Sequence, residues 1–160
     1  MTRETQEVSD HDYLRTAERT IAAPASAIFA FLSDPHRHPD IDGSGTVVAV
    51  SASDLPLRGG STFDMRMKRG FPYVTRSTVV ELETDRVIAW QTRPLTQPLA
   101  LLIGGRIWRY ELTEVEGGTR VVETWDLRPE RNRALVKPLA GDPVADMTAT
   151  LERLEGVLTA

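Results

Sequence analysis

The feature that constrains this chain most is a run of β-strand patterns between residues 46 and 127, followed by one long helical pattern. Between turn residues, apolar and polar side chains alternate, which is typical of strands with one buried face. Strands are predicted over 46–51, 61–69, 73–83, 87–93, 106–115 and 119–127. Because the strands follow one another without alternating helices, the pattern favours an antiparallel meander over a parallel sheet.

Other elements are predicted on either side of this run. Residues 13–21 form a first strand, and Pro24 opens an amphipathic helix over 24–33, where its missing N–H is not needed. A second short helix or turn covers 35–41. At the other end, Asp142 and Pro143 suit the N-cap and first position of a final helix, whose apolar residues recur every three or four positions.

Two segments are not predicted as regular elements. Residues 128–143 contain three prolines and one glycine, too many for one helix or strand. Residues 1–12 are mostly polar and are expected to be a disordered tail, which leaves a single domain over 13–160.

The composition excludes several classes of function. The chain has no cysteine, so it has no disulfide, thiolate nucleophile or cysteine-ligated metal. Its net charge is −4 with no basic stripe, which argues against binding nucleic acid. The polar N-terminus lacks a signal-peptide core, and the apolar segment 94–105 is shorter than the roughly 20 residues of a membrane span. A cytoplasmic protein without cofactor is expected.

Three strings carry a resemblance to a known family. ERTIAAPASAIFAFLSDP, GGTRVVETWDL and DMTATLERLEGVL resemble the opening strand and helix, the last hairpin and the closing helix of the START-like, Bet v 1-like superfamily (SRPBCC), of the polyketide cyclase/dehydrase and lipid-transport type. The resemblance implies an α+β helix-grip fold, in which a seven-stranded curved antiparallel sheet wraps a long C-terminal helix and two short helices follow the first strand. Members of this superfamily include carriers, cyclases, hydroxylase components and regulatory proteins.

One segment departs from the family. Relatives usually have an aromatic residue, often Trp, after the first helix, but here the segment reads HRHPDIDGSG. A ligand-binding mode that needs this aromatic is therefore in doubt.

The inward strand faces predict a cavity. A curved sheet has more inward surface than one helix covers, and its inward residues here are large and adaptable, including all three tryptophans. A plain close-packed core is the alternative. The residues predicted to bind a small apolar ligand are Phe63, Met65, Met67, Trp90, Thr92, Trp108, Tyr110, Glu123, Trp125, Met147 and Leu151.

Glu123 is a candidate acid or base. A carboxyl group between Val121 and Trp125 on an inward face needs a partner or a proton. It is expected either to contact ligand or to form a salt bridge, for instance with Arg106 or Arg76, unless it faces solvent.

The second candidate is His38. Together with His36, Asp40 and Asp42 it forms a series of ionisable residues at every second position. In an extended chain these would share one side, but two prolines interrupt the segment, so a solvated loop is favoured over a metal site. A histidine at the cavity mouth acting as acid or base is a further possibility.

Three functions remain open from the sequence. The first is binding of a lipid, polyketide or isoprenoid-like molecule in the cavity, and the second is a cyclase or dehydratase reaction in the same cavity with Glu123 or His38 moving a proton. The third is a regulatory or interaction module without ligand. A homodimer is possible, and segment 94–105 is expected to be a lid or an interface.

Overall fold

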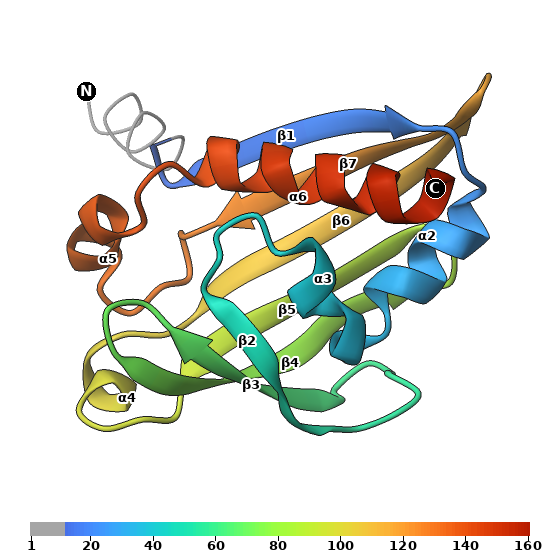
Figure 1. Cartoon of the computed structure of the whole chain (residues 1–160). Helices are drawn as coiled ribbons and strands as arrows, with labels where there is room; N and C mark the ends of the chain where they lie inside the picture. The colour runs from blue at the N-terminus through green and yellow to red at the C-terminus, as the bar shows by residue number, and fades with distance from the viewer. Residues whose placement is uncertain (1–11) are drawn as a thin grey trace.

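The computed structural model describes residues 12–160, so most of the predicted N-terminal tail lies outside the described residues. Figure 1 shows a strongly bent sheet with one long helix lying across its concave face. The elements in chain order are β1 (Leu14–Ile21), α2 (Ala25–Leu32), η1 (Pro35–Arg37), α3 (His38–Ile41), β2 (Val47–Ser53), β3 (Thr62–Lys68), β4 (Pro72–Glu83), β5 (Val87–Pro94), α4 (Leu99–Leu102), β6 (Arg106–Val115), β7 (Gly118–Asp126), α5 (Arg133–Leu139) and α6 (Pro143–Thr159).

The sheet has seven strands in the order β1-β7-β6-β5-β4-β3-β2. Each neighbouring pair is antiparallel. The strand β1 forms one edge of the sheet and pairs with β7 along its whole length. The predicted helix-grip fold is confirmed. Alternation along each strand sends one set of side chains toward α6 and the other set away from it.

The convex face is held by cross-strand ion pairs. Arg109 on β6 reaches Glu81 on β4 at 2.7 Å, over Ala89 of the strand between them. This contact leaves Ala89 buried although its side of the sheet faces outward. Arg76 on β4 pairs with its direct register partner on β3, Asp64, at 2.8 Å, so Arg76 is not a partner of Glu123.

The helix α6 begins as the sequence predicts. The Asp142 side chain accepts a hydrogen bond from the Ala145 N–H, and Pro143 takes the first helical position. The apolar stripe of the helix turns toward the sheet, with Met147, Leu151 and Leu154 buried. Val144, in the first turn of the helix, has the same spacing but is exposed.

Two short helices lie where none was predicted. The apolar segment 94–105 contains α4, and the proline-rich segment before α6 contains α5, with Pro138 inside it. The two helices are connected, since the side chains of Arg131 and Asn132, just before α5, donate hydrogen bonds to the backbone carbonyls of Leu101 and Leu102 in α4. Among residues 12–160, no helix has the length and apolar character to cross a membrane.

Candidate ligand cavity

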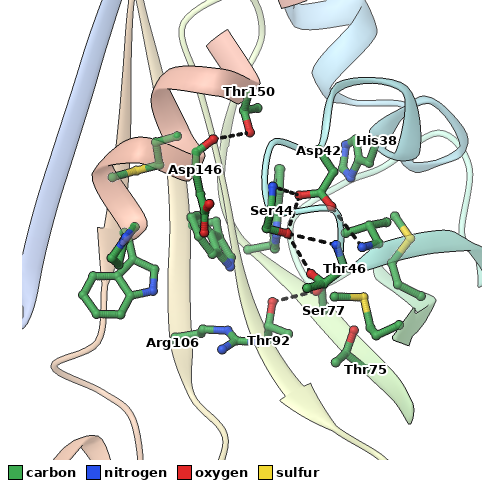
Figure 2. A pocket seen from close by; sticks show the side chains of 18 of the residues that line it. His38, Asp42, Ser44, Thr46, Thr75, Ser77, Thr92, Arg106, Asp146 and Thr150 are labelled. Atoms are coloured by element: carbon green, nitrogen blue, oxygen red, sulfur yellow. Dashed lines mark hydrogen bonds between the residues drawn. The ribbon is translucent and has the colours of Figure 1, made fainter. Parts of the chain in front are cut away.

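A cavity of about 160 Å³ lies between the sheet and the N-terminal half of α6. Figure 2 shows it from close by, with polar side chains of α6, of the loop before β2 and of strands β4 to β6 around it. An engineered protein cavity of about 150 Å³ holds one benzene molecule, so this volume takes a guest of at least that size. Of the residues predicted to bind a ligand, those that line the cavity are Phe63, Met65, Met67, Trp90, Thr92, Trp108, Tyr110, Glu123, Trp125 and Met147.

Leu151 does not line the cavity. It is buried with Leu154 in the solid core, where Ile28 and Phe31 of α2 fill the space under α6. Met147 lies one helical turn earlier, beyond the reach of α2, and therefore meets the hollow.

The three tryptophans form the middle of the cavity floor. Trp90 of β5 pairs with Trp108 of β6, which pairs with Trp125 of β7, so the three indoles occupy one row across the sheet. One row toward α2, Tyr110 pairs with Glu123. Aromatic rings in a row present a broad apolar surface to any flat guest.

Glu123 is buried, with 2% of its surface exposed, and it faces the cavity as predicted. The Tyr110 hydroxyl donates a hydrogen bond to Oε1 at 2.7 Å, while Oε2 is buried without a partner. Burial raises the pKa of Glu123 to about 8, although the Tyr110 hydrogen bond acts in the opposite direction. At neutral pH the carboxyl group is therefore mostly protonated, and since Oε1 accepts from Tyr110, the proton lies on Oε2 and is free to be donated.

The same environment acts on Tyr110. Burial, followed by the nearby Glu123 carboxyl, raises the pKa of Tyr110 well above its usual value. Both groups of the pair are thus neutral near pH 7, and the pair offers a ligand one hydrogen-bond donor, on Oε2.

His38 forms a wall of the cavity. Its ring stacks on Trp90, with centroids 4.9 Å apart, and meets the ring of Phe63 edge-on. Its Nε2 lies 2.7 Å from the carbonyl of Leu32, so this nitrogen carries the proton and donates it to the backbone. Burial lowers the pKa of His38, which keeps the ring neutral at pH 7. The imidazole thus supplies an aromatic surface in the segment that lacks an aromatic residue.

Of the other members of the His-Asp series, Asp42 lines the cavity with His38, while His36 and Asp40 do not. His36 is exposed and pairs with Asp34, because 35–41 is helical rather than extended. Asp42 also holds the loop before β2, because its carboxylate accepts hydrogen bonds from the backbone N–H groups of Ser44 and Val47. In the described part of the chain, no three His, Asp or Glu side chains gather as a metal-binding group.

Gly43 brings the loop into direct contact with α6. Its N–H donates to the Thr150 hydroxyl at 2.9 Å. A Cβ at this position would lie 2.2 Å from the Asp146 carbonyl oxygen, so only glycine allows the two backbones to come this close.

Several cavity residues were not predicted. Arg106, Thr75 and Ser77 line the floor, and Asp146 and Thr150 line the α6 side (Figure 2). Arg106 lies on the same face of β6 as Trp108 and Tyr110, so the alternation along the strand, continued back to its first residue, would have predicted it. Asp146 and Thr150 each lie beside or one turn from Met147 on the helix.

Segment 94–105 contributes no residue to the cavity. Leu101 and Leu102 of α4 are exposed, as are Leu135 and Leu139 of α5. The predicted role of segment 94–105 as a lid therefore has no support in these contacts, and its role as an interface stays a prediction.

Comparison with known proteins finds a family and relatives that resemble this chain. The family model described as "Polyketide cyclase / dehydrase and lipid transport" matches residues 15–159. The uncharacterized protein Rv0088 of Mycobacterium tuberculosis is 38% identical over 108 residues, which cover 66% of this chain and 44% of that protein. The matched part of the chain thus spans less than half the length of that relative.

Two solved structures share the fold. Protein Ms6760 from Mycobacterium smegmatis superimposes with a TM-score of 0.72 at 18% identity, covering 94% of this chain and 93% of the other. The di-domain ARO/CYC StfQ from the steffimycin biosynthetic pathway gives 0.65 at 16% identity, covering 96% of this chain and 53% of the other. With the helix-grip sheet, the cavity under α6 and a family match from residue 15 to residue 159, this chain belongs to the polyketide cyclase/dehydrase and lipid transport family.

Proposed function

We propose that the protein binds a small hydrophobic or amphipathic molecule in the cavity between the sheet and α6. The observation that carries this proposal is the combination of an apolar floor with an unsatisfied polar atom. The indoles of Trp90, Trp108 and Trp125 supply apolar surface, while Glu123 Oε2 is buried in the cavity wall without a partner. Buried polar atoms in folded proteins nearly always have hydrogen-bond partners, and a ligand oxygen would supply the missing one here.

The family supports the same function at a coarser level, because its description includes lipid transport. The volume of about 160 Å³ favours a compact guest, such as a molecule of one to three rings or a short-chain lipid. Larger members of the lipid, polyketide or isoprenoid-like classes would need the cavity to widen.

The test is a search for a bound guest. Native mass spectrometry of the protein purified from its expression host should detect a co-purifying small molecule, and an apolar fluorescent dye should bind and be displaced by it. Ala140→Trp places a bulky ring at the cavity rim and should weaken dye binding at least tenfold. The matched control Ala145→Trp changes an exposed position of α6 and should leave binding unchanged.

Dye affinity that is the same in both variants, with no co-purifying molecule, would contradict ligand binding. That result would favour the third reading, a module that acts through its surface. Loss of a partner contact on changing Leu101 and Leu102 to Ser, with dye binding intact, would support that reading directly.

A second candidate function is catalysis in the same cavity. Glu123 is mostly protonated at pH 7, and its Oε2 proton is free to move to a ligand oxygen, which is what a general acid requires for a dehydration or cyclisation step. The Nε2 proton of His38 is committed to the Leu32 carbonyl, so Glu123 is the better acid of the two predicted candidates.

The two functions separate at Glu123. Glu123→Gln keeps the shape and the acceptor for Tyr110 but removes the transferable proton. Under the catalytic reading it should abolish turnover of a substrate identified by the mass spectrometry above, while ligand affinity stays within about tenfold, or about 1.4 kcal/mol. Full turnover by the variant would exclude Glu123 as the acid.

A further inference from the structure

The cavity contains a half-buried cation, Arg106, for which the described residues supply no partner. Arg106 is the first residue of β6, and its side chain lies on the cavity floor beside Thr92 (Figure 2). Its Nε is buried without a hydrogen bond, and its guanidinium forms no ion pair with a carboxylate within residues 12–160. Arginine keeps its charge in proteins, so Arg106 brings a positive charge into the hollow.

The surroundings do not neutralise this charge. Burial lowers the pKa of Arg106, and the guanidinium of Arg69 at the rim adds like-charge repulsion. Tyr73 and Glu130 act in the opposite direction, but the Glu130 carboxylate is occupied by the Gly104 N–H and lies outside ion-pair distance. An unpaired buried charge is unfavourable, and an anion placed against it would remove much of that cost.

Hydroxyl groups continue the polar floor next to Arg106. Thr92 is its register partner on β5, and Ser77 pairs with Thr92 on β4, with their hydroxyl oxygens 2.9 Å apart. A guanidinium with adjacent hydroxyls is a set of donors that suits a carboxylate, which accepts several hydrogen bonds at once.

The second polar position of the cavity lies at the opposite end of the floor. Arg106, Trp108 and Tyr110 follow one another at every second residue of β6, so the indole row separates Arg106 from the Tyr110–Glu123 pair. Four residues of a strand span about 13 Å. The floor therefore runs from a cation, over an apolar middle, to a neutral hydrogen-bond donor.

We propose that the ligand is a monocarboxylic acid with a flat apolar body, whose carboxylate pairs with Arg106 and whose far end carries a neutral oxygen that accepts from Glu123. This inference rests on the proposed function and narrows it to one ligand class. The flat body follows from the aromatic row, on which rings stack favourably. The carboxylate follows from Arg106 on the deep floor. A second anionic group is disfavoured because the carboxylates of Asp42, on the loop before β2, and Asp146, on α6, line the same cavity and would repel it.

The experiment uses rigid probes that differ in one group. The first is 6-hydroxy-2-naphthoic acid, which has a carboxylate and a hydroxyl at opposite ends of two fused rings. Its methyl ester lacks the charge, and 2-naphthoic acid lacks the hydroxyl. Affinities are measured by titration calorimetry at pH 7. We expect the acid to bind at least tenfold more tightly than the ester, because hydrogen bonds to a charged group are the strong ones. Removing the hydroxyl should weaken binding by about threefold to tenfold.

Two variants locate the charge effect. Arg106→Met keeps the length of the side chain and should lower the affinity for the acid at least tenfold while leaving the ester within about twofold. Arg66→Met is the matched control, since it removes the same charge from an exposed position on the outward side of β3. If Arg106→Met does not fold, the acid-to-ester ratio of the unmodified protein still decides, together with Arg106→Lys, which should retain a preference for the acid.

The outcomes separate this inference from the proposed function. Tight binding of the ester, with no preference for the acid in the unmodified protein, overturns the carboxylic-acid class and leaves ligand binding intact. An acid preference that persists in Arg106→Met but is lost in Arg66→Met also overturns it. Failure of all three probes, together with failure of the dye and mass-spectrometry tests, overturns both proposals.

Discussion

The two halves of the space under α6 are built differently. Beneath the C-terminal half, Leu151 and Leu154 are at most 1% exposed and pack with α2 into a continuous core. Beneath the N-terminal half, Met147 and Thr150 meet a cavity instead. The same helix and the same curved sheet thus form a solid core at one end and a hollow at the other.

The difference comes from what fills the gap between sheet and helix. At the solid end, α2 lies near the C-terminal half of α6 (Figure 1), and its Ile28 and Phe31 are buried in the same core as Leu151 and Leu154. At the hollow end the corresponding cover is the loop 42–46 and the turn before α6, which contribute small and polar side chains. Stability is therefore concentrated at the α2 end, which leaves the other end available for a ligand.

The largest expected effect is a difference in stability between substitutions at the two ends of α6. Leu154→Ala should lower the free energy of unfolding by about 4 kcal/mol, because it leaves a new void in a solid core. Met147→Ala, equally buried but facing an existing hollow, should cost about half as much. Urea denaturation of both variants measures this difference. Equal losses would mean that the Met147 end is packed as tightly as the Leu154 end.

The next effect concerns the pH dependence of stability. Glu123 has a folded-state pKa of about 8 against an ordinary value of 4.5, so the folded protein holds a proton that the unfolded chain releases. The contribution of Glu123 to the free energy of unfolding is therefore fully present below about pH 4.5 and is lost as pH rises toward 8.

Glu123→Gln removes this dependence while keeping the shape of the neutral acid. We expect the two proteins to have similar stability at pH 4.5 and the variant to be more stable by roughly 4 kcal/mol at pH 8. Denaturation at a series of pH values gives the comparison, in which contributions from His38 and other groups are shared by both proteins. Parallel curves would show that Glu123 has an ordinary pKa and that this end of the cavity is wet.

The smallest effect tests the hydrogen bond that the cavity does satisfy. Tyr110→Phe should cost about 1 kcal/mol of stability, the usual net contribution of one hydrogen bond. Because the Tyr110 hydroxyl lowers the pKa of Glu123, its loss should raise that pKa further. A carboxyl-detected NMR titration measures the change, and a fall in the pKa would be inconsistent with the geometry described above.

Strand alternation was sufficient to predict most of the floor. Residues such as Met65, Trp108 and Glu123 face inward because side chains alternate along a strand regardless of what covers the sheet. The apolar stripe of α6 was predicted correctly too, but helical periodicity does not show which end of the stripe faces the cavity. Met147 and Leu151 have the same periodicity, and only the position of α2 in three dimensions distinguishes them.

Other features depended on contacts that no local pattern encodes. The ring of His38 is buried against Trp90, a residue 52 positions later in the sequence. The helix α5 was not predicted either, because it contains Pro138. Its neighbour α4 is held to it by side-chain hydrogen bonds to backbone carbonyls, which no periodicity in the sequence reveals.

The contact at Gly43 sets a limit on guest size that side chains cannot relax. A larger ligand usually gains room by rotating a methionine or tilting an aromatic ring, and the Met65 and Met67 side of this cavity allows that. On the Gly43 side the boundary is main chain against main chain, so growth in that direction requires the whole of α6 to shift. Relatives that accommodate bulkier molecules should therefore differ in the length or path of this loop rather than only in the residues that line the pocket.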